Sequence, residues 1–486
     1  MLSDAKPPSE TERRSSSHET STSAKTSLDA NTLEKGGNST SPEPDGFDSS
    51  ETLRESETFV SWDGPNDPDN PRNWSKKQRW TVTLVVSLFT FISPVGSSIS
   101  SPSLPAISRE LNIAPGSILE NMTLSIFVLA YALGPLIWGP LSELFGRLPI
   151  LQISNIWFLI FNTLCPFAKT PTQMLVFRFL AGFGGAAPQS IGGGVVGDLW
   201  SPEERGMAMS VYSLAPLVGP STGPLVGGWI ALKSRWQWVF WSVSIADAIL
   251  QIAGFIFLRE TYAPQLLKRK AQSLRKETGK SNIRSAFEAT DRHWPAVMGR
   301  GIAKPLKFLA TEPIVQVFAL YMAVLYGVLY LSLTTFVKVF TDQYGQNSGI
   351  AGLHYLAIAL GSTVGGQVGA RVLNKIYRKL KARNGGVGTP EMRCQLDNDS
   401  VYRAAFQVDN YALYAASAIA GVSSFRAFAG FGFPLFADKM YAKLGDGWGN
   451  SILALICLVI GCPSPFIFYR YGPRLRAWSK AASLEQ

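Results

Sequence analysis

The chain has 486 residues, of which 46% are hydrophobic and only 16% are charged, whereas soluble proteins average about 25% charged residues. This balance excludes an ordinary soluble domain and favours a protein with many apolar spans. The formal net charge is +10, but the basic residues gather between and after apolar runs, which indicates orientation in a membrane and not a nucleic-acid surface. The four cysteines show no metal-ligand spacing, so we expect buried thiols without metal or disulfides.

Residues 1–75 are predicted to be a disordered cytosolic tail. Most of this stretch is rich in Ser, Thr, Glu and Lys and cannot bury enough apolar surface to offset the entropy of ordering. No apolar run follows Met1, so no cleaved signal peptide is expected. Prolines and Asn/Asp dominate residues 60–73, and Trp74 and Trp80 bracket a basic cluster. These features predict an interfacial anchor that leads into the first span.

Six apolar runs of membrane-spanning length follow within residues 76–258, the predicted N-terminal half. They lie near 80–100, 118–138, 149–168, 174–197, 206–231 and 236–258. Basic residues precede the first run, and a long basic segment follows the sixth. The positive-inside rule therefore places the N-terminus in the cytosol.

A loop of eleven residues, Gly139-Pro-Leu-Ser-Glu-Leu-Phe-Gly-Arg-Leu-Pro149, is expected between the second and third runs. Its shortness predicts an antiparallel helical hairpin, in which Gly139 and Gly146 permit tight turning and Glu143 and Arg147 can pair or cap helix ends. The stretch resembles the signature between the second and third helices of the major facilitator superfamily, whose usual Asp is Glu143 here. The resemblance implies a transporter in which these four residues gate the cytosolic face.

The fourth run carries Arg178, followed by a glycine-rich stretch and Asp198. An arginine inside a span is costly unless it faces a polar cavity or snorkels to the interface. Its position resembles the family's fourth-helix motif, which implies a role in coupling proton and substrate movement. Asp198 and, in the sixth run, Asp247 are further coupling candidates, because an acid inside a membrane is usually functional. The first run contains no acid, so the proton-carrying carboxylate stays unidentified.

In the fifth run, Gly219, Gly223 and Gly227 recur every four residues and form one smooth helix face. Pro220 and Pro224 remove backbone donors and bend the helix, so a merely kinked helix is one interpretation. The spacing, completed by Gly228, resembles the fifth-helix motif of antiporters in the same superfamily. That resemblance implies a face that packs on a neighbouring helix and blocks proton leak, and it favours export over import.

Residues 259–312 are predicted to be a basic cytosolic loop between halves, residues 313–476 an incomplete second half, and residues 477–486 a cytosolic tail. Several stretches between about Trp62 and Arg476, among them Gly349-Ile-Ala-Gly-Leu-His-Tyr and Gly447-Trp-Gly-Asn-Ser, resemble the fungal drug:proton antiporters with twelve spans. In that family two further spans separate the segments that begin here at Gly385 and Tyr411. The intervening residues 392–410 are too short and too charged to cross a bilayer. We therefore predict about ten spans, from a mis-joined or spliced transcript, a decayed gene or a true ten-helix variant.

The sequence thus predicts an all-α, two-half membrane bundle similar to the major facilitator superfamily. We expect a monomeric, multi-pass plasma-membrane exporter of amphipathic small molecules, with both termini cytosolic. The resemblance implies a proton gradient as the energy source and no cofactor. A nutrient or polyamine importer, and a non-transporting membrane protein, remain open alternatives. The three histidines lie in no nucleophile or metal constellation, so we do not expect an enzyme.

Overall fold

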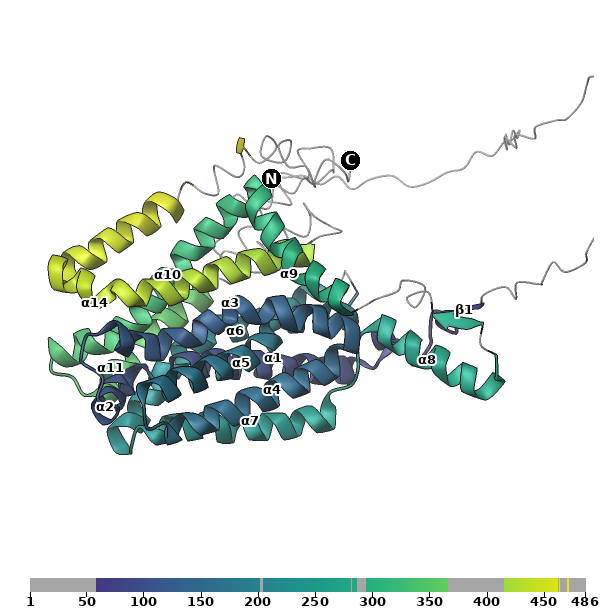
Figure 1. Ribbon diagram of the computed structural model, residues 1–486, viewed down its shortest axis with the longest axis horizontal. Coiled ribbons are helices and arrows are strands. Elements are labelled where there is room, and N and C mark those ends of the chain that lie inside the picture. The colour runs from purple at the N-terminus through teal and green to yellow at the C-terminus, as the bar shows by residue number, and fades with distance from the viewer. Residues whose placement is uncertain are drawn as a thin grey trace, which may run out of the picture. The chain divides into compact units, whose positions relative to one another are not determined.

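The computed structural model describes residues 58–201, 204–280, 282–285, 294–365, 415–461, 463 and 470–471. Within these residues the chain is almost entirely helical, and the long helices lie side by side in a bundle (Figure 1). Seven helical segments of the described residues are long and apolar enough to cross a membrane. The predicted class, an all-α membrane bundle, is confirmed.

Six long helices occupy the residues in which six spans are predicted. Side-chain caps fix where several of them begin, because Ser75 accepts a hydrogen bond from the backbone of Gln78 and Thr170 accepts one from Gln173. Short pieces follow α1 and α4, namely η2 (Ser101–Ser103), α2 (Leu104–Glu110) and η3 (Cys165–Phe167). The six helices are α1 (Lys76–Ser98), α3 (Ile118–Phe145), α4 (Arg147–Leu164), α5 (Pro171–Leu199), α6 (Arg205–Lys233) and α7 (Gln237–Phe257).

The connection between α3 and α4 is much shorter than the sequence predicts. The prediction of an eleven-residue loop is wrong. Helix α3 continues to Phe145, α4 begins at Arg147, and Gly146 alone turns the chain. Gly146 has a φ of 99°, a conformation that glycine adopts readily and other residues rarely do. The prediction failed because Gly139 and Pro140 read as loop residues, whereas a membrane bundle tolerates both inside a helix.

The second half contributes four helical stretches to the described residues. Helix α10 (Pro313–Asp342) is followed by α11 (Ser348–Leu353), and the chain is helical again from 355 to 365. Helix α14 (Ala415–Gly461) folds back on itself (Figure 1), because Gly445 interrupts it with a φ of 68° and a ψ of 165°. The predicted gap of two spans at residues 392–410 lies outside the described residues.

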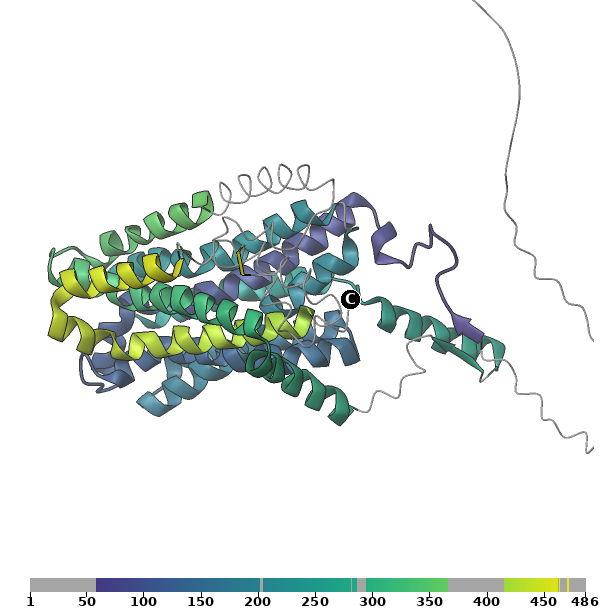
Figure 2. The ribbon, with the colours of Figure 1, turned by 90° about the horizontal axis from the view of Figure 1, so that it is seen from above.

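The linker between the halves contains α8 (Ala263–Thr278), β2 (Ile283–Ser285) and α9 (Trp294–Thr311). Strand β2 pairs in parallel with β1 (Thr58–Val60), and α8 lies beside this pair (Figure 2). Val60, Ala271 and Ile283 form a small buried cluster there. The predicted disordered tail of residues 1–75 therefore extends too far along the chain, because regular structure already begins at Thr58. Residues 58–75 include β1 and the short helix η1 (Pro71–Asn73) because apolar partners on α8 and β2 are available to them.

Asp67 fixes the turn between β1 and α1. Its carboxylate accepts hydrogen bonds from the backbone nitrogens of Asp63 (2.8 Å) and Asp69 (2.9 Å), and Lys270 Nζ lies 3.1 Å from Oδ2. The backbone hydrogen bonds from Asp63 and Asp69, and then the Lys270 ammonium, lower the pKa of Asp67 from its ordinary value. Because Lys270 belongs to α8, Asp67 ties the N-terminal segment to the linker.

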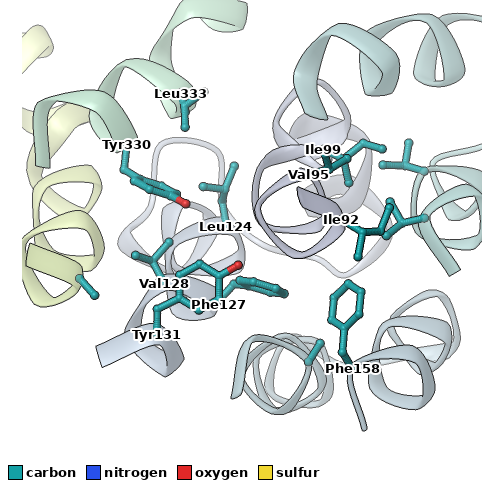
Figure 3. Close-up of a cluster of buried hydrophobic side chains, with 14 of the residues drawn as sticks. Ile92, Val95, Ile99, Leu124, Phe127, Val128, Tyr131, Phe158, Tyr330 and Leu333 are labelled. Atoms are coloured by element: carbon teal, nitrogen blue, oxygen red, sulfur yellow. The ribbon is translucent and has the colours of Figure 1, made fainter. Parts of the chain in front are cut away.

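The largest buried cluster lies between the two halves. Figure 3 shows side chains from α1, α3 and α10 pointing into it, among them Ile92, Phe127 and Tyr330. Phe158 on α4 joins it from the side, and Tyr355 adds a contact from beyond α11. In a membrane, neighbouring helices are held together by close packing and not by the removal of apolar side chains from water, so this cluster forms one packed contact between the halves.

Candidate functional site

Arg178 on α5 is completely buried, and its guanidinium joins three helices. It donates hydrogen bonds to the carbonyls of Gly96 (2.8 Å) and Ser97 (2.7 Å) on α1, and of Thr123 (3.1 Å) and Leu124 (3.4 Å) on α3. Because α1 ends at Ser98, the carbonyls of Gly96 and Ser97 belong to the last turn of a helix and have no partner within it. The snorkelling interpretation is therefore wrong. Arg178 satisfies helix-end carbonyls in the centre of the first half.

Asp247 on α7 is also completely buried. Asn155 on α4 donates to Asp247 Oδ1 at 3.0 Å and to Gln251 Oε1 at 2.8 Å. The structure thus places Asp247 in a polar contact between α4 and α7, whereas the partners of Arg178 are on α1 and α3. The two predicted coupling residues do not share a site.

A charged network surrounds Gly146 at one end of the bundle, which we call the α3–α4 end. Arg147 Nη1 donates to Ser142 Oγ at 2.6 Å, Arg147 Nε lies 3.6 Å from Asp198 Oδ2, and the guanidinium stacks over the Tyr262 ring at 4.7 Å. Asp198, predicted as a coupling residue beside Arg178, therefore lies with Arg147. The network links the α3–α4 hairpin to the end of α5 and to the start of the linker.

Glu260 belongs to the same network, and sequence reasoning missed it. Its carboxylate accepts hydrogen bonds from the backbone nitrogens of Arg147 (2.9 Å) and Leu148 (3.3 Å), the free donors at the start of α4. A Cβ on Gly146 would lie within 3 Å of this carboxylate. An acid beside a helix N-terminus is favourable, but Glu260 follows the sixth run and lies 113 residues from Arg147, so no local pattern in the sequence indicates this contact.

The other two residues of the predicted gate lie on the last two turns of α3. Gly139 is helical, and a Cβ there would meet nothing within 4 Å. Glu143 is exposed. The structure therefore brings Gly146 and Arg147 together with Asp198, and Gly139 contributes its carbonyl, which accepts a hydrogen bond from Ser142 Oγ at 2.7 Å.

The glycines of α6 form the predicted smooth face, and it packs on α1. A Cβ on Gly219 would lie 2.9 Å from the Pro94 side chain, one on Gly223 would lie 2.7 Å from the Val95 carbonyl oxygen, and one on Gly227 would collide with the Ile99 carbonyl oxygen. Pro220 and Pro224 lie on the same buried side of the helix. Small residues are what allow two helices to approach this closely in a membrane.

Gly228 faces in a different direction, toward the second half. A Cβ on Gly228 would lie 2.5 Å from the Ser348 carbonyl oxygen, and one on Gly352 would lie 2.8 Å from the Pro224 carbonyl oxygen. Helix α6 is therefore packed tightly on both α1 and α11. It forms part of the seam along which the two halves meet.

Hydroxyl groups lie within the apolar cluster at this seam. Ser97 Oγ and Tyr330 OH are 3.1 Å apart across the two halves, and Ser93 Oγ and Tyr131 OH are 2.6 Å apart within the first half. Arg426 on α14 lies over the Tyr326 ring, 4.9 Å from its centre. The seam thus combines aromatic surface with a few polar groups, as is usual in small-molecule sites.

A multi-pass helical bundle with two packed halves, a polar-aromatic seam and a charged network at one end defines a membrane transporter. The chain belongs to the Major Facilitator Superfamily, whose family model matches residues 86–389.

Two fungal relatives extend over nearly the whole chain. Efflux pump vrtL of Penicillium aethiopicum is 43% identical over 493 positions, which cover 94% of this chain and 97% of the relative. Efflux pump radE of Floropilus chiversii is 37% identical and covers 86% of this chain and 85% of its own length. The match with vrtL is longer than the 486 residues of this chain, so vrtL carries residues that this chain lacks.

Solved structures show the same fold at low identity. The proton:xylose symporter XylE is 15% identical with a TM-score of 0.53, and covers 82% of this chain and 96% of its own. The peptide transporter POT is 14% identical with a TM-score of 0.54, and covers 83% and 96%. Both establish the architecture alone.

Proposed function

We propose that this protein is a proton-coupled exporter of amphipathic small molecules that works by alternating access. The observation that carries the proposal is the kinship, at 43% and 37% identity over most of the chain, with proteins named as efflux pumps. The protein would act as a monomer in the plasma membrane, with the proton gradient as its energy source. Its two halves would rock about the seam, so that substrate is open to one side at a time.

The seam supports this class of substrate. Phe127, Tyr131, Tyr326 and Tyr330 offer apolar surface together with hydroxyl groups, at the boundary between the halves. These side chains would line the opening when the halves separate, and a molecule with both apolar and polar parts suits such a lining. The close approach of α6 to α11 supports the mechanism, because it gives the two halves a contact about which they can rock.

The orientation follows from the basic residues. Lys76, Lys77 and Arg79 begin α1, and the linker between the halves is rich in Lys and Arg. We infer from the positive-inside rule that the α3–α4 end faces the cytosol, as do both termini. The network of Arg147, Asp198 and Glu260 would then close the cytosolic side when the protein opens outward.

Export can be tested in yeast cells that lack their own drug pumps. Cells expressing the 486-residue chain should accumulate less of a fluorescent amphipathic dye than cells with an empty vector, and a protonophore should abolish the difference. Surface-biotinylation measures the amount of protein at the plasma membrane. Greater accumulation with the chain present would instead indicate an importer, and equal accumulation with normal surface amounts would refute transport of this class.

A further inference from the structure

A charge cluster joins the two halves at the end of the bundle opposite Gly146, which we call the α10–α11 end. Lys338 Nζ near the end of α10 lies 3.3 Å from Glu120 Oε2 and 3.2 Å from Asp438 Oδ1. Asn121 Nδ2 donates to Asp438 Oδ2 at 2.7 Å. Glu120 and Asn121 begin α3 in the first half, whereas Lys338 and Asp438 belong to the second half.

The cluster lies beside a cavity of about 960 Å³ at the same end. The side chain of Glu120 is 3% exposed, but those of Lys338 and Asp438 are 24% and 23% exposed, so water can reach the cluster from the cavity. The other charged groups lining the cavity are Arg109 and Glu110 on α2, Arg235 before α7, and Asp342 at the end of α10. Glu110 is engaged elsewhere, because it accepts hydrogen bonds from Trp236 and Gln237.

Two carboxylates share one ammonium in this cluster, which leaves one excess negative charge. Lys338 and Asp438 are in the same half, so their ion pair survives when the halves separate at this end. Glu120 does not keep its cation, because Lys338 moves away with the second half. What stays with Glu120 is the backbone nitrogen of Gly116 at 2.7 Å and Ser108 Oγ at 3.2 Å. A carboxylate that loses its cation in a partly buried site is destabilised in its charged form.

We propose that Glu120 takes up a proton from the outside and that this protonation opens the α10–α11 end of the transporter. The proton moves from external water onto a Glu120 oxygen, Lys338 keeps its own proton and stays with Asp438, and the charges on each half remain balanced. In the closed state Lys338 stabilises charged Glu120, so closing and protonation of Glu120 oppose each other. Assigning this end to the outside rests on the proposed orientation.

The gate can be measured without any transport assay, by labelling a cysteine that lies beneath it. Ser97 is completely buried, and it lies one helical turn before Ser101, which lines the cavity. We would introduce Ser97→Cys after replacing the four native cysteines by serine, and label intact cells with a membrane-impermeant maleimide. The exposed cavity residue Ser234, as Ser234→Cys, supplies a reference rate that corrects for the effect of pH on thiol reactivity.

The expected result has two parts. At about pH 7.5, Glu120→Gln, which mimics the protonated acid, should speed labelling at position 97 about tenfold. Lowering the external pH from this value should speed labelling, relative to the reference, in the protein with Glu120 but not in Glu120→Gln. Glu120→Asp keeps a carboxylate and should keep the pH response, which also guards against a general folding defect.

Glu110→Gln is the matched control. It also removes an acid from this cavity, but the hydrogen-bond partners of Glu110 are Trp236 and Gln237 and not Lys338. The proposal is overturned if Glu120→Gln labels at the wild-type rate, if it keeps the pH response, or if Glu110→Gln has the same effect. If the α10–α11 end instead faces the cytosol, the labelling pattern differs from all of these outcomes. Both cysteines would then react only after the cells are permeabilised, while the contrast between Glu120 and Glu110 variants would remain.

Discussion

Arg178 satisfies four backbone carbonyls on α1 and α3, so it should matter for folding as well as for transport. Arg178→Ala removes all four donors and leaves a cavity, which we expect to cost roughly 3 kcal/mol or more. Thermal unfolding of the purified protein in detergent, together with its amount at the cell surface, would measure this. Arg178→Lys should recover part of the loss, because an ammonium can still reach some of the carbonyls. A wild-type melting temperature with transport lost would instead assign Arg178 to coupling alone.

Gly146 and Gly139 allow a matched comparison within the segment predicted as a gate. Gly146→Ala places a Cβ at a positive φ and against the Glu260 carboxylate, and strain of this kind costs on the order of 1–3 kcal/mol. We expect the α4 cap to be displaced, with a lower melting temperature and about a tenfold loss of dye export. In Gly139→Ala the added Cβ meets nothing within 4 Å, so the melting temperature and dye export should stay unchanged. Equal effects of the two substitutions would contradict the role assigned to the Glu260 cap.

At the scale of elements, α6 can be tested by its packing on α1. Gly227→Ala adds a Cβ that collides with the backbone of Ile99, whereas Gly206→Ala on the same helix meets nothing within 4 Å. We expect the first to lower stability by roughly 1–3 kcal/mol through overpacking and to reduce export. Gly206→Ala should be neutral or slightly stabilising, because alanine favours a helix over glycine. Normal export and stability in Gly227→Ala would show that α6 and α1 need not lie this close.

The strand pair formed by β1 and β2 gives a second element-scale prediction. Asp67→Ala removes the acceptor for two backbone nitrogens and for Lys270, so residues 58–75 should detach from α8. Limited trypsin digestion should then cut at Arg72, Lys76 and Lys77 several-fold faster, while Asp69→Ala, whose side chain is exposed, should change nothing. Since the pKa of Asp67 is lowered on folding, its charge stabilises this turn at neutral pH. That contribution is lost only as the pH falls below the ordinary pKa of an aspartate toward the lowered pKa of Asp67 in the folded protein.

Helices and their apolar lengths could be predicted from the sequence, because a bilayer demands long runs of apolar residues. The smooth face of α6 was equally readable, since four-residue spacing alone places Gly219, Gly223 and Gly227 on one side. What could not be read were contacts between distant segments. Glu260 at the start of α4, and Lys338 between Glu120 and Asp438, depend on where helices meet, and local pattern carries no information on that. The strand pair was missed for the same reason, because β1 and β2 are three residues each and more than 200 residues apart.

At the scale of the whole molecule, α1 contacts both the rest of the first half and the second half, and α6 packs against it. Helix α1 contacts α6 through the glycine face, is held to α3 and α5 by Arg178, and meets the second half where Ser97 faces Tyr330. Movement of one half relative to the other must therefore change contacts along α1. The buried Arg178, the glycine face of α6 and the aromatic cluster are far apart in the sequence, but all three contact α1. A movement of α1 therefore affects all three.

Sequencing the transcript can show whether the second half normally contains two more spans than this chain. The match with vrtL covers 493 positions against 486 residues here, and the predicted missing pair of spans falls at residues 392–410. We expect messenger RNA sequenced across this junction to include a longer form with about 50 additional, mainly apolar residues, enough for two spans and a turn. Expressed side by side at equal surface amounts, the longer form should export dye faster, because two more helices would complete the wall of the cavity between the halves. If every transcript has the short junction, the protein is a ten-span variant, since losing an antiparallel pair leaves the orientation of the last two spans unchanged.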